Sequence, residues 1–437
     1  MSIELVTLLL FGSFLLLMIA GVPLVFALGG SAVIGTYFLW GPNALYAVGI
    51  RTFSSATSFV LLAIPMFIFM GAMLERSGIA GDLYEMMQKW LGALNGGLAV
   101  GTVLVCTIFA ALVGVSGAAT VTMAMVALPS MLSHNYSKGI SLGCIAGGGA
   151  LGVLIPPSVM MIVLGLYTNT SVGMLFLGGI TAGMVIVLLF ALYILIVCAW
   201  KPELGPAVPV AERASWPEKL RALRSVIMPL ALITLVLGSI VGGAATPSEA
   251  AGIGALGAMI SAASRRKLSW EAVYESCKIT LRLSCMVMWI VFAAAIFTSL
   301  YAAVGADQLV RDALSWLPGG KWGVLVGMQV IWIVMGAFLD PIGIMILTAP
   351  LFFPLAVSLG FDPVWLGVLF VVNMEMAFLT PPFGFNLFYL RSVVPKGVTM
   401  GDIYKSVAPF VALQALALVL MIIFPGLITW LPYTLLR

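Results

Sequence analysis

Long apolar segments, separated by short polar ones, follow one another along the whole chain. A membrane-spanning helix needs about 20 consecutive apolar residues, and ten segments approach that length. They lie approximately at residues 3–20, 22–40, 57–74, 140–166, 179–200, 225–243, 248–264, 279–300, 364–390 and 406–430. The pattern therefore predicts an all-α polytopic membrane protein.

Two further apolar regions, residues 97–132 and 322–357, are each interrupted near the middle. The interruptions are residues 114–117 (GVSG) and 340–343 (DPIG), which contain the glycine and proline residues that commonly bound helices. Each region forms either two crossings or one re-entrant helical hairpin. Both alternatives return the chain to the side that it left, so the orientation of the other segments is unchanged.

Basic residues set the expected orientation, because Lys and Arg in short loops stay on the cytoplasmic side. Segments 201–224 and 265–282 hold ten of the 20 Lys and Arg residues. If both segments are cytoplasmic, both termini face outward, and six more basic residues lie inside: Arg76, Lys89, Lys138, Arg391, Lys396 and Lys405. The basic residues left outside are Arg51, Arg311, Lys321 and Arg437.

An internal repeat relates the two halves of the chain. A shift of 225 residues pairs the Pro-Pro sequence at 156–157 with the one at 381–382 (381 − 156 = 225). Further pairs, with at most one residue of slippage, are Pro129 and Pro354, Trp90 and Trp316, and Gly101 and Gly327. The loop at 167–173 has no charge, whereas its counterpart at 391–405 is basic. We therefore expect inverted repeats, the arrangement in which many transporters build a site at the membrane midplane.

The repeat divides the chain into four parts. We expect N-terminal scaffold helices in residues 1–56, a first inverted repeat in 57–200, cytoplasmic loops with scaffold helices in 201–278, and a second inverted repeat in 279–437. Each repeat contains one helical hairpin, at about 97–132 or 322–357. Each also contains one Pro-Pro-broken helix, at 140–166 or 364–390.

The composition of the chain mainly excludes classes of partner and of site. The chain is 62% hydrophobic and 8% charged, and its net charge of +4 is spread over its whole length, so we expect no nucleic-acid partner. The single His134 and the five scattered cysteines lack the spacing of a zinc site or a catalytic triad. The glycine pattern at 147–152 matches a dinucleotide fingerprint, but no strand precedes it. Close helix packing is the better interpretation there and for the glycine pair at 139 and 143.

The Pro-Pro pairs are the first candidate site elements. Two adjacent prolines remove two backbone donors from a membrane helix, and the freed carbonyls survive at membrane depth only inside protein or beside a wet cavity. A packing kink is the alternative for one such pair, but the recurrence of the pair in both halves favours a site. Ser158, Thr380 and Asn386 flank the pairs with hydrogen-bonding side chains.

The interrupted hairpins supply the other candidates. Ser116, Gly117 and Thr120 offer hydroxyls and exposed backbone at the first interruption, and Asp340 lies in the second. An aspartate near the bilayer centre costs about 2.5–3.5 kcal/mol on insertion scales, so it should face a cavity or a partner. Carbonyls, hydroxyls and a carboxylate suit a sodium ion, while the N-terminal ends of half-helices suit an anion. For Glu375, ion contact and a structural hydrogen bond both stay open.

The chain resembles a known family, the large membrane (M) subunit of tripartite ATP-independent periplasmic (TRAP) transporters. The resemblance rests on residues 148–158 (GGALGVLIPPS), 245–250 (ATPSEA), 338–341 (FLDP) and 379–386 (LTPPFGFN), and it extends over essentially the whole chain. It implies an ion-transporter fold in which hairpins and Pro-Pro helices form an elevator-like transport domain. Where many relatives carry a second hydroxyl after the Ser-Gly of the first hairpin tip, this chain has Ala118.

The resemblance also implies an activity and partners. It implies that the chain lies in the inner membrane of a bacterium and takes part in sodium-coupled uptake of a small organic anion, a carboxylate or a sulfonate. A periplasmic binding protein would deliver this anion. It further implies a small four-helix membrane (Q) subunit, which we expect as a separate chain. The implied sodium ligands map to Ser116, Gly117, Pro156, Pro157, Asp340, Thr380, Pro381 and Pro382. We assign substrate contacts to Thr120, Ser158, Glu375 and Asn386.

Three other functions are compatible with parts of this pattern. A stand-alone sodium–carboxylate symporter would need no binding protein. An intramembrane enzyme would need a cluster of His, Asp or Cys at one interface, and the sequence suggests none. A passive channel would show no saturable, sodium-coupled flux. We therefore expect a transporter subunit that is not an enzyme and uses sodium ions but no organic cofactor, while the identity of the organic acid stays open.

Overall fold

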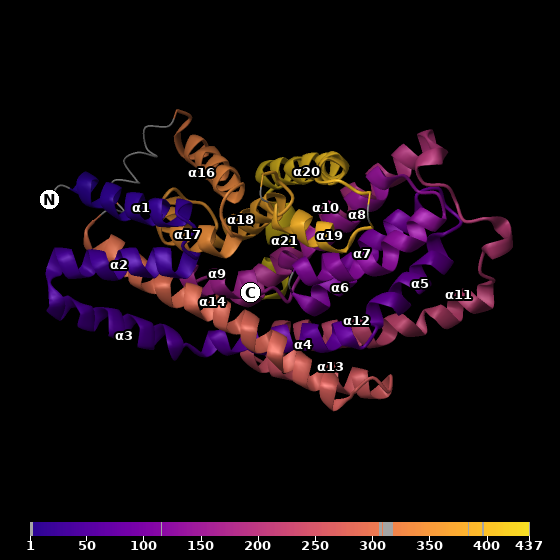
Figure 1. Cartoon of the computed structure of the whole chain (residues 1–437), viewed down its shortest axis with the longest axis horizontal. Coiled ribbons are helices and arrows are strands. Elements are labelled where there is room, and N and C mark those ends of the chain that lie inside the picture. Colours follow the sequence, from indigo (N-terminus) through magenta and orange to yellow (C-terminus); the bar gives the residue numbers. More distant parts are fainter. Residues whose placement is uncertain are drawn as a thin grey trace.

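The computed structural model describes residues 3–114, 116–305, 308, 318–382, 384–395 and 397–436. These residues form helices joined by short connections, and none of them is in a strand, so the all-α prediction is confirmed. Figure 1 shows many of the helices running along the long axis of the molecule. The sequence predictions for Arg311, Trp316, Lys396 and Arg437 lie outside the described residues.

Seven helical segments of the described chain are long and apolar enough to cross a membrane. They are Phe59–Arg76, Ser116–Ser133, Val172–Trp200, Trp216–Val241, Trp270–Ala303, Pro341–Ser358 and Met400–Ile423. Shorter apolar helices of 10–17 residues lie between them. The chain is therefore a multi-pass membrane protein.

The N-terminal helices pack around one long helix. They are α1 (Ile3–Ile19), α2 (Leu24–Trp40) and α3 (Leu45–Ala56), with a short 3₁₀ turn, η1 (Pro42–Ala44), before α3. The long helix, α14 (Trp270–Ala303), packs against α2 and α3. Because α3 is amphipathic and short, the search for apolar segments missed it.

A second group of helices forms the lower edge of the molecule in Figure 1. It consists of η2 (Phe59–Leu62), α4 (Ala63–Arg76), α12 (Arg224–Val241) and α13 (Pro247–Ser264), and α4 packs against both α13 and α14. Thr246 and Glu249 form a capping box at the start of α13, in which a Glu249 Oε2 atom accepts from the Thr246 backbone N–H at 2.8 Å. The acidic residue at this turn therefore caps a helix.

The segment predicted to be the first repeat continues after α4 with a series of helices. After α5 (Ile79–Leu91) come α6 (Gly97–Val113), α7 (Ser116–Ser133), α8 (Lys138–Ala150), η3 (Leu151–Val153), α9 (Val159–Thr168) and α10 (Val172–Trp200). Helix α6 ends at Gly114, whose φ of +66° lies in the left-handed region that glycine adopts without a steric penalty. The interrupted region at 97–132 is therefore two helices, the first of which ends at Gly114, and the choice between a re-entrant hairpin and two crossings stays a prediction.

The second repeat has the same elements. They are α16 (Gly320–Gly336), α17 (Pro341–Ser358), α18 (Pro363–Ala377), α19 (Phe385–Val393) and α20 (Met400–Ile423). The starts of α7 and α17, at Ser116 and Pro341, are 225 residues apart, as are those of α8 and α18, at Lys138 and Pro363. The two repeats contact each other, because α7 packs against α19 of the second repeat and α17 packs against α9 of the first. Figure 1 shows α9, α18 and α19 in the middle of the molecule.

Some predicted segments differ from the observed helices. The apolar run at 406–430 is two helices, because α20 ends at Ile423, and α21 (Gly426–Leu435) begins after Pro425. Proline lacks the N–H that would continue α20, so the chain starts a new helix there. Helix α14 begins at Trp270, well before the predicted residue 279, because the Ser269 hydroxyl accepts from the Ala272 N–H at 3.1 Å.

The segment between the repeats is less regular. It contains η4 (Pro202–Leu204), η5 (Val210–Glu212) and α11 (Trp216–Ala222) before α12.

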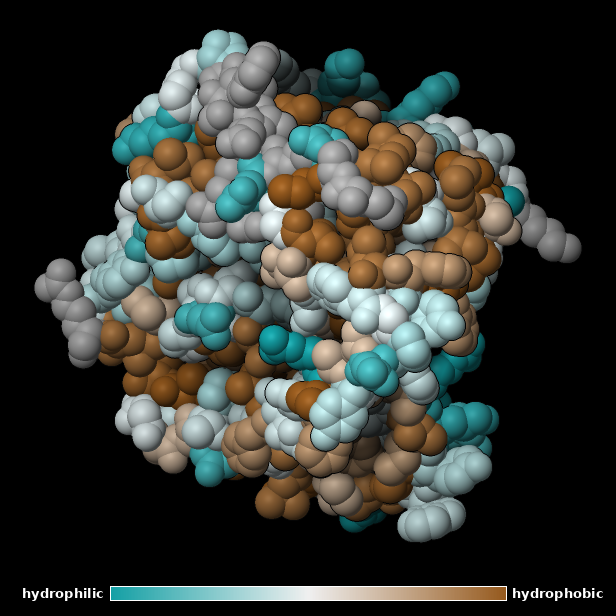
Figure 2. Space-filling model, turned by 90° about the vertical axis from the view of Figure 1, so that its left-hand side faces the viewer, coloured by the Kyte–Doolittle hydropathy of each residue, from teal (hydrophilic) through white to brown (hydrophobic). Residues whose placement is uncertain are grey.

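Figure 2 looks onto the end of the molecule that lies on the left in Figure 1, and it shows a recess near the middle of that face with hydrophilic residues beside it.

Glycines bring α8 into close contact with its neighbours. A Cβ atom at Gly143 would collide with the backbone oxygen of Ser406 and the ring of Phe410, both on α20. A Cβ atom at Gly139 would meet nothing within 4 Å. The packing interpretation is therefore confirmed for Gly143 and wrong for Gly139, which lies on the exposed first turn of α8.

Replacing Gly143 by alanine should destabilise the protein by about 1–3 kcal/mol, because a backbone oxygen of α20 must move to accept the new methyl group. Gly139→Ala on the same helix is the matched control and should leave stability unchanged or slightly raised. Thermal unfolding of the detergent-purified proteins measures both effects. Equal melting temperatures for the two variants would contradict the close α8–α20 contact.

Candidate functional site

Both Pro-Pro pairs interrupt their helices, as the sequence predicts. The first pair, Pro156 and Pro157, lies in the non-helical stretch between η3 and α9, and the second, Pro381 and Pro382, lies between α18 and α19. Both Pro–Pro peptide bonds are cis. Each break separates a half-helix whose carbonyls have lost their intrahelical donors from one whose N–H groups have lost their acceptors.

The first break is buried, and a serine bridges it. Ser158 donates its hydroxyl to the Val153 carbonyl at 2.5 Å and accepts from the Met161 N–H at 3.3 Å. One side chain therefore supplies a donor to the carbonyl end of the break and caps the N-terminus of α9. All residues from Ala150 to Ser158 are buried.

The second break is more open. Pro381 and Pro382 are exposed, and Thr380 is half-buried. Thr380 donates its hydroxyl to the Met376 carbonyl at 2.8 Å, and the Tyr404 hydroxyl donates to the Pro382 carbonyl at 3.2 Å. As at the first break, hydroxyls take the place of the missing backbone donors.

The tip of the first hairpin lies between the two breaks. A Cβ atom at Gly114 would lie 2.6 Å from the Pro157 carbonyl oxygen, so only glycine allows this approach to the first break. On the other side, Ser116 donates its hydroxyl to Asn386 Oδ1 at 2.7 Å, and the Tyr389 ring covers Gly117. The tip therefore contacts both broken helices, although they belong to different repeats.

Asn386 connects three segments at this point. Besides accepting from Ser116, its Nδ2 donates to the Ala146 carbonyl on α8 at 3.2 Å, and its backbone N–H donates to the Phe378 carbonyl across the second break at 3.2 Å. Asn386 has no solvent exposure. A buried amide with this many partners fixes the positions of α7, α8 and α19 relative to one another.

Thr120 lies one turn beyond the tip on α7. Its hydroxyl donates to the Ser116 carbonyl at 3.1 Å, and the side chain fills the space left by Gly149 on α8. Thr120 is fully buried. The structure thus places it behind the tip, and its predicted contact with a substrate stays a prediction.

Asp340 lies at the N-terminus of α17, the second helix of the other hairpin. Its Oδ2 accepts from the Ile342 N–H at 3.0 Å, which makes it the N-cap of α17, and its side chain is half-buried. Gly336, at the end of α16, packs against Ala377, at the end of α18, so this tip lies beside the start of the second break. Within the described chain, no hydrogen bond joins Asp340 to Ser116 or to either break.

The sequence left two roles open for Glu375, ion contact and a structural hydrogen bond, and the structure shows the hydrogen bond. It is completely buried on α18, and its Oε1 accepts from Gln414 Nε2 on α20 at 2.9 Å. Asn373, two residues earlier, donates to Gln329 Oε1 on α16 at 2.9 Å. These bonds tie α18 to α16 and α20, and contact between Glu375 and an ion or substrate stays a prediction.

Known proteins resemble the chain over nearly its full length. Residues 11–427 match the family model described as "Tripartite ATP-independent periplasmic transporter, DctM component". The chain belongs to this family. A C4-dicarboxylate TRAP transporter large permease protein from Vibrio cholerae is 33% identical over 439 residues, which cover 95% of each chain. The isethionate TRAP transporter permease protein DctMQ of Oleidesulfovibrio alaskensis is 31% identical over 96% of this chain and 65% of its own.

A solved structure shows the same fold. The YdaH transporter of Alcanivorax borkumensis matches with a TM-score of 0.63 over 90% of this chain and 91% of its own, at 16% identity. At that identity the likeness concerns the fold alone. Because the DctM relatives are permease subunits of transporters, this DctM-family chain is a permease subunit and not an enzyme.

Sequence patterns did not reveal several residues of the site. Tyr389 covers the hairpin tip, Tyr404 donates to the second break, and the Ala146 carbonyl receives the Asn386 amide. Nothing in the local sequence marks them, because a tyrosine near a loop or an alanine within an apolar helix is common in membrane proteins. Tertiary packing brings them to the site.

The bond between Ser116 and Asn386 can be tested with a double-mutant cycle. Ser116→Ala and Asn386→Ala should each destabilise the protein, and together by less than the sum, with a coupling of about 1 kcal/mol. Asn373→Ala is the control partner, because Asn373 bonds α16 and should combine additively with Ser116→Ala. Unfolding in mixed micelles of SDS and a mild detergent measures the four states. Equal coupling in both cycles would refute a direct bond.

Proposed function

We propose that this DctM-family chain is the permease subunit of a sodium-coupled secondary transporter that imports a small organic anion across the bacterial inner membrane. The observation that carries the proposal is the meeting of a hairpin tip with two broken helices from different repeats. Polar backbone and hydroxyls then gather inside an otherwise apolar helical bundle. Such an arrangement supports ion and substrate binding.

Oxygen atoms at this meeting point, together with one carboxylate of the second hairpin, suit sodium. Hard oxygen donors of the kind that bind alkali and alkaline-earth cations are present in both repeats. They are the Ser116 hydroxyl, the Gly117 backbone, the carbonyls around Pro156–Pro157 and around Thr380–Pro382, and the Asp340 carboxylate. Asp340 is the one acidic side chain among these ligands, so it would neutralise part of the ion's charge. The two hairpin tips would supply ligands from opposite repeats.

The same region suits an organic anion. Helices α7, α9 and α19 all begin at the tip or at the breaks, so their N–H groups and positive dipole ends lie near the site. Asn386 and Ser158 border these helix starts. Relatives are named for a C4-dicarboxylate and for isethionate, which is a sulfonate, and both are small organic anions. We infer a small carboxylate or sulfonate as the substrate.

Contacts between the repeats suggest which parts move together. Helix α7 packs on α8 and α19, and α17 packs on α9 and α18, so the hairpins and broken helices form one connected body. Helices α4, α13 and α14 form a second group, which would serve as the scaffold of an elevator. If two or more sodium ions accompany each monoanion, each net charge that enters gains about 2.3 kcal/mol per 100 mV of membrane potential.

We propose two protein partners and an orientation. A small membrane (Q) subunit would bind as a separate chain, and a periplasmic binding protein would deliver the anion. One relative is a fused DctMQ permease, which supports a stable association between the two membrane parts. From the distribution of basic residues, both termini would lie on the periplasmic side.

Asp340→Asn should raise the sodium concentration for half-maximal uptake about tenfold or more, because the ion loses its one charged ligand. Asparagine still caps a helix, so α17 should be retained. Asp362→Asn is the matched control, because Asp362 is likewise an N-cap followed by proline, at the start of α18. Counterflow or uptake in proteoliposomes measures the effect. Wild-type sodium dependence in Asp340→Asn would contradict the assigned ligand.

Uptake by proteoliposomes that contain the reconstituted permease should require a sodium gradient, the Q subunit and the loaded binding protein. Omitting the binding protein separates the proposed system from a stand-alone symporter, which would transport the free anion without it. Omitting sodium tests the coupling itself. Undiminished uptake in sodium-free buffer would exclude sodium coupling, and undiminished uptake without the binding protein would exclude the tripartite system.

A further inference from the structure

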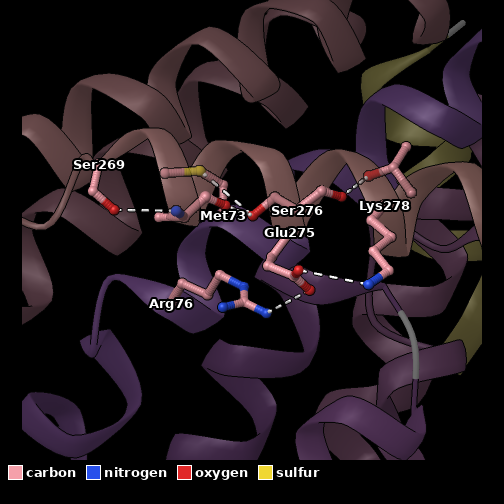
Figure 3. Close-up of polar contacts among 8 residues, drawn as sticks. Met73, Arg76, Ser269, Glu275, Ser276 and Lys278 are labelled. Carbon is pink, nitrogen blue, oxygen red and sulfur yellow. Dashed lines mark hydrogen bonds and ion pairs between the residues drawn. The ribbon is translucent and has the colours of Figure 1, made fainter.

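Helix α14 is longer than a membrane requires. Its 34 residues span about 51 Å at 1.5 Å per residue, whereas the hydrocarbon core of a bilayer is about 30 Å thick. Part of α14 therefore lies outside the hydrocarbon. Ion pairs mark the polar level at its N-terminal end, because Arg76 of α4 pairs with Glu275 at 3.9 Å and Arg265 pairs with Asp82 (Figure 3 shows the Arg76–Glu275 pair).

Four side chains form a row along this part of α14, which we call the interfacial ridge. Trp270, Tyr274, Lys278 and Arg282 follow one another at every fourth position, the spacing that places residues on one side of a helix. All four are exposed, with relative exposures of 83% for Trp270 and 58% for Tyr274. The ridge thus combines two aromatic rings with two cations on one outward surface.

The protein neutralises this surface only in part. Glu275, beside the ridge, pairs with Arg76 and, at 3.7 Å, with Lys278, which therefore reaches back toward the polar end of the helix (Figure 3). Arg282 lies about 10 Å further along α14 than Glu275, and no acidic side chain of the described residues lies within ion-pair distance of it. An unpaired guanidinium next to the apolar part of a span is costly unless an anion meets it.

Below the ridge, α14 continues as an apolar exposed surface. Leu281, Met286 and Trp289 are 67%, 50% and 60% exposed, as expected of side chains in contact with lipid tails. A lipid that lies along this surface brings its headgroup to the level of the ridge. Lys278 and Arg282 can then donate charge-assisted hydrogen bonds to a phosphate, and Trp270 and Tyr274 lie on its polar side.

We propose that the interfacial ridge binds the phosphate of an anionic phospholipid and so anchors α14 at the membrane surface. The full chain, reconstituted in nanodiscs, should retain phosphatidylglycerol in preference to phosphatidylcholine, as measured by native mass spectrometry. Lys278→Ala and Arg282→Ala should each weaken phosphatidylglycerol retention about fivefold, because each removes one cation near the surface.

Controls separate a site from general charge attraction. Lys278→Arg should retain wild-type binding, because it keeps the charge and the donors. The double variant Lys201→Ala/Lys405→Ala removes two charges elsewhere and should retain the preference. Arg282→Gln serves as the second neutral variant if Arg282→Ala misfolds. Equal retention of both lipids by the wild type, or an equal loss in the Lys201/Lys405 variant, would overturn the proposal.

Native cysteines distinguish a lipid from a protein on the ridge. Of the five cysteines, Cys277 and Cys285 are exposed beside the ridge, whereas Cys106, Cys144 and Cys198 are buried. If lipid covers the ridge, both exposed thiols should stay reactive toward a lipid-soluble maleimide when the Q subunit is added. Protection of Cys277 and Cys285 by that subunit would show that the ridge is a protein interface and would refute the lipid site.

Discussion

A backbone that leaves the helical conformation within a membrane must find its hydrogen-bond partners inside the protein, because lipid offers none. The two Pro-Pro breaks create this demand, and the surrounding structure meets it with hydroxyls and one buried amide. Ser158 serves the first break, Thr380 and Tyr404 serve the second, and Asn386 joins the second break to the first hairpin. The site exists because these unsatisfied groups lie close enough to share partners.

The two breaks are related by sequence but differ in their surroundings. The first is buried and covered by the hairpin tip, with the Gly114 backbone against the Pro157 carbonyl. The second leaves both prolines exposed. The difference extends to the preceding helices, because Asn373 and Glu375 on α18 bond their neighbours, whereas the corresponding positions of α8, Gly148 and Ala150, have no polar side chain. Side-chain hydrogen bonds therefore tie the helix before the open break to its neighbours, whereas glycines allow the helix before the buried break to pack closely against its neighbours.

Local signals account for what could be predicted. Proline pairs and interruptions that contain glycine or proline, such as GVSG and DPIG, commonly end helices, so the positions of the breaks could be assigned from the residues, whereas the choice between a re-entrant hairpin and two crossings could not. Apolar length alone was a poorer guide. It joined α20 to α21 across Pro425, missed the amphipathic α3, and placed the start of α14 too late, because the Ser269 cap and the first turns of α14 are polar. Of the glycine pair on α8, Gly143 packs closely and Gly139 does not, which depends on the neighbour that each one faces.

The amino-acid sequence by itself determined the helical membrane architecture, the twofold repeat and the positions at which each repeat breaks. Those features follow from apolar length, from proline and glycine chemistry, and from an offset of 225 residues. Only the tertiary structure decided that the first hairpin tip bonds the second broken helix, that Glu375 bonds Gln414, and that Tyr389 covers Gly117. These contacts join residues far apart in the chain, and their energies depend on distances and burial that no local pattern specifies.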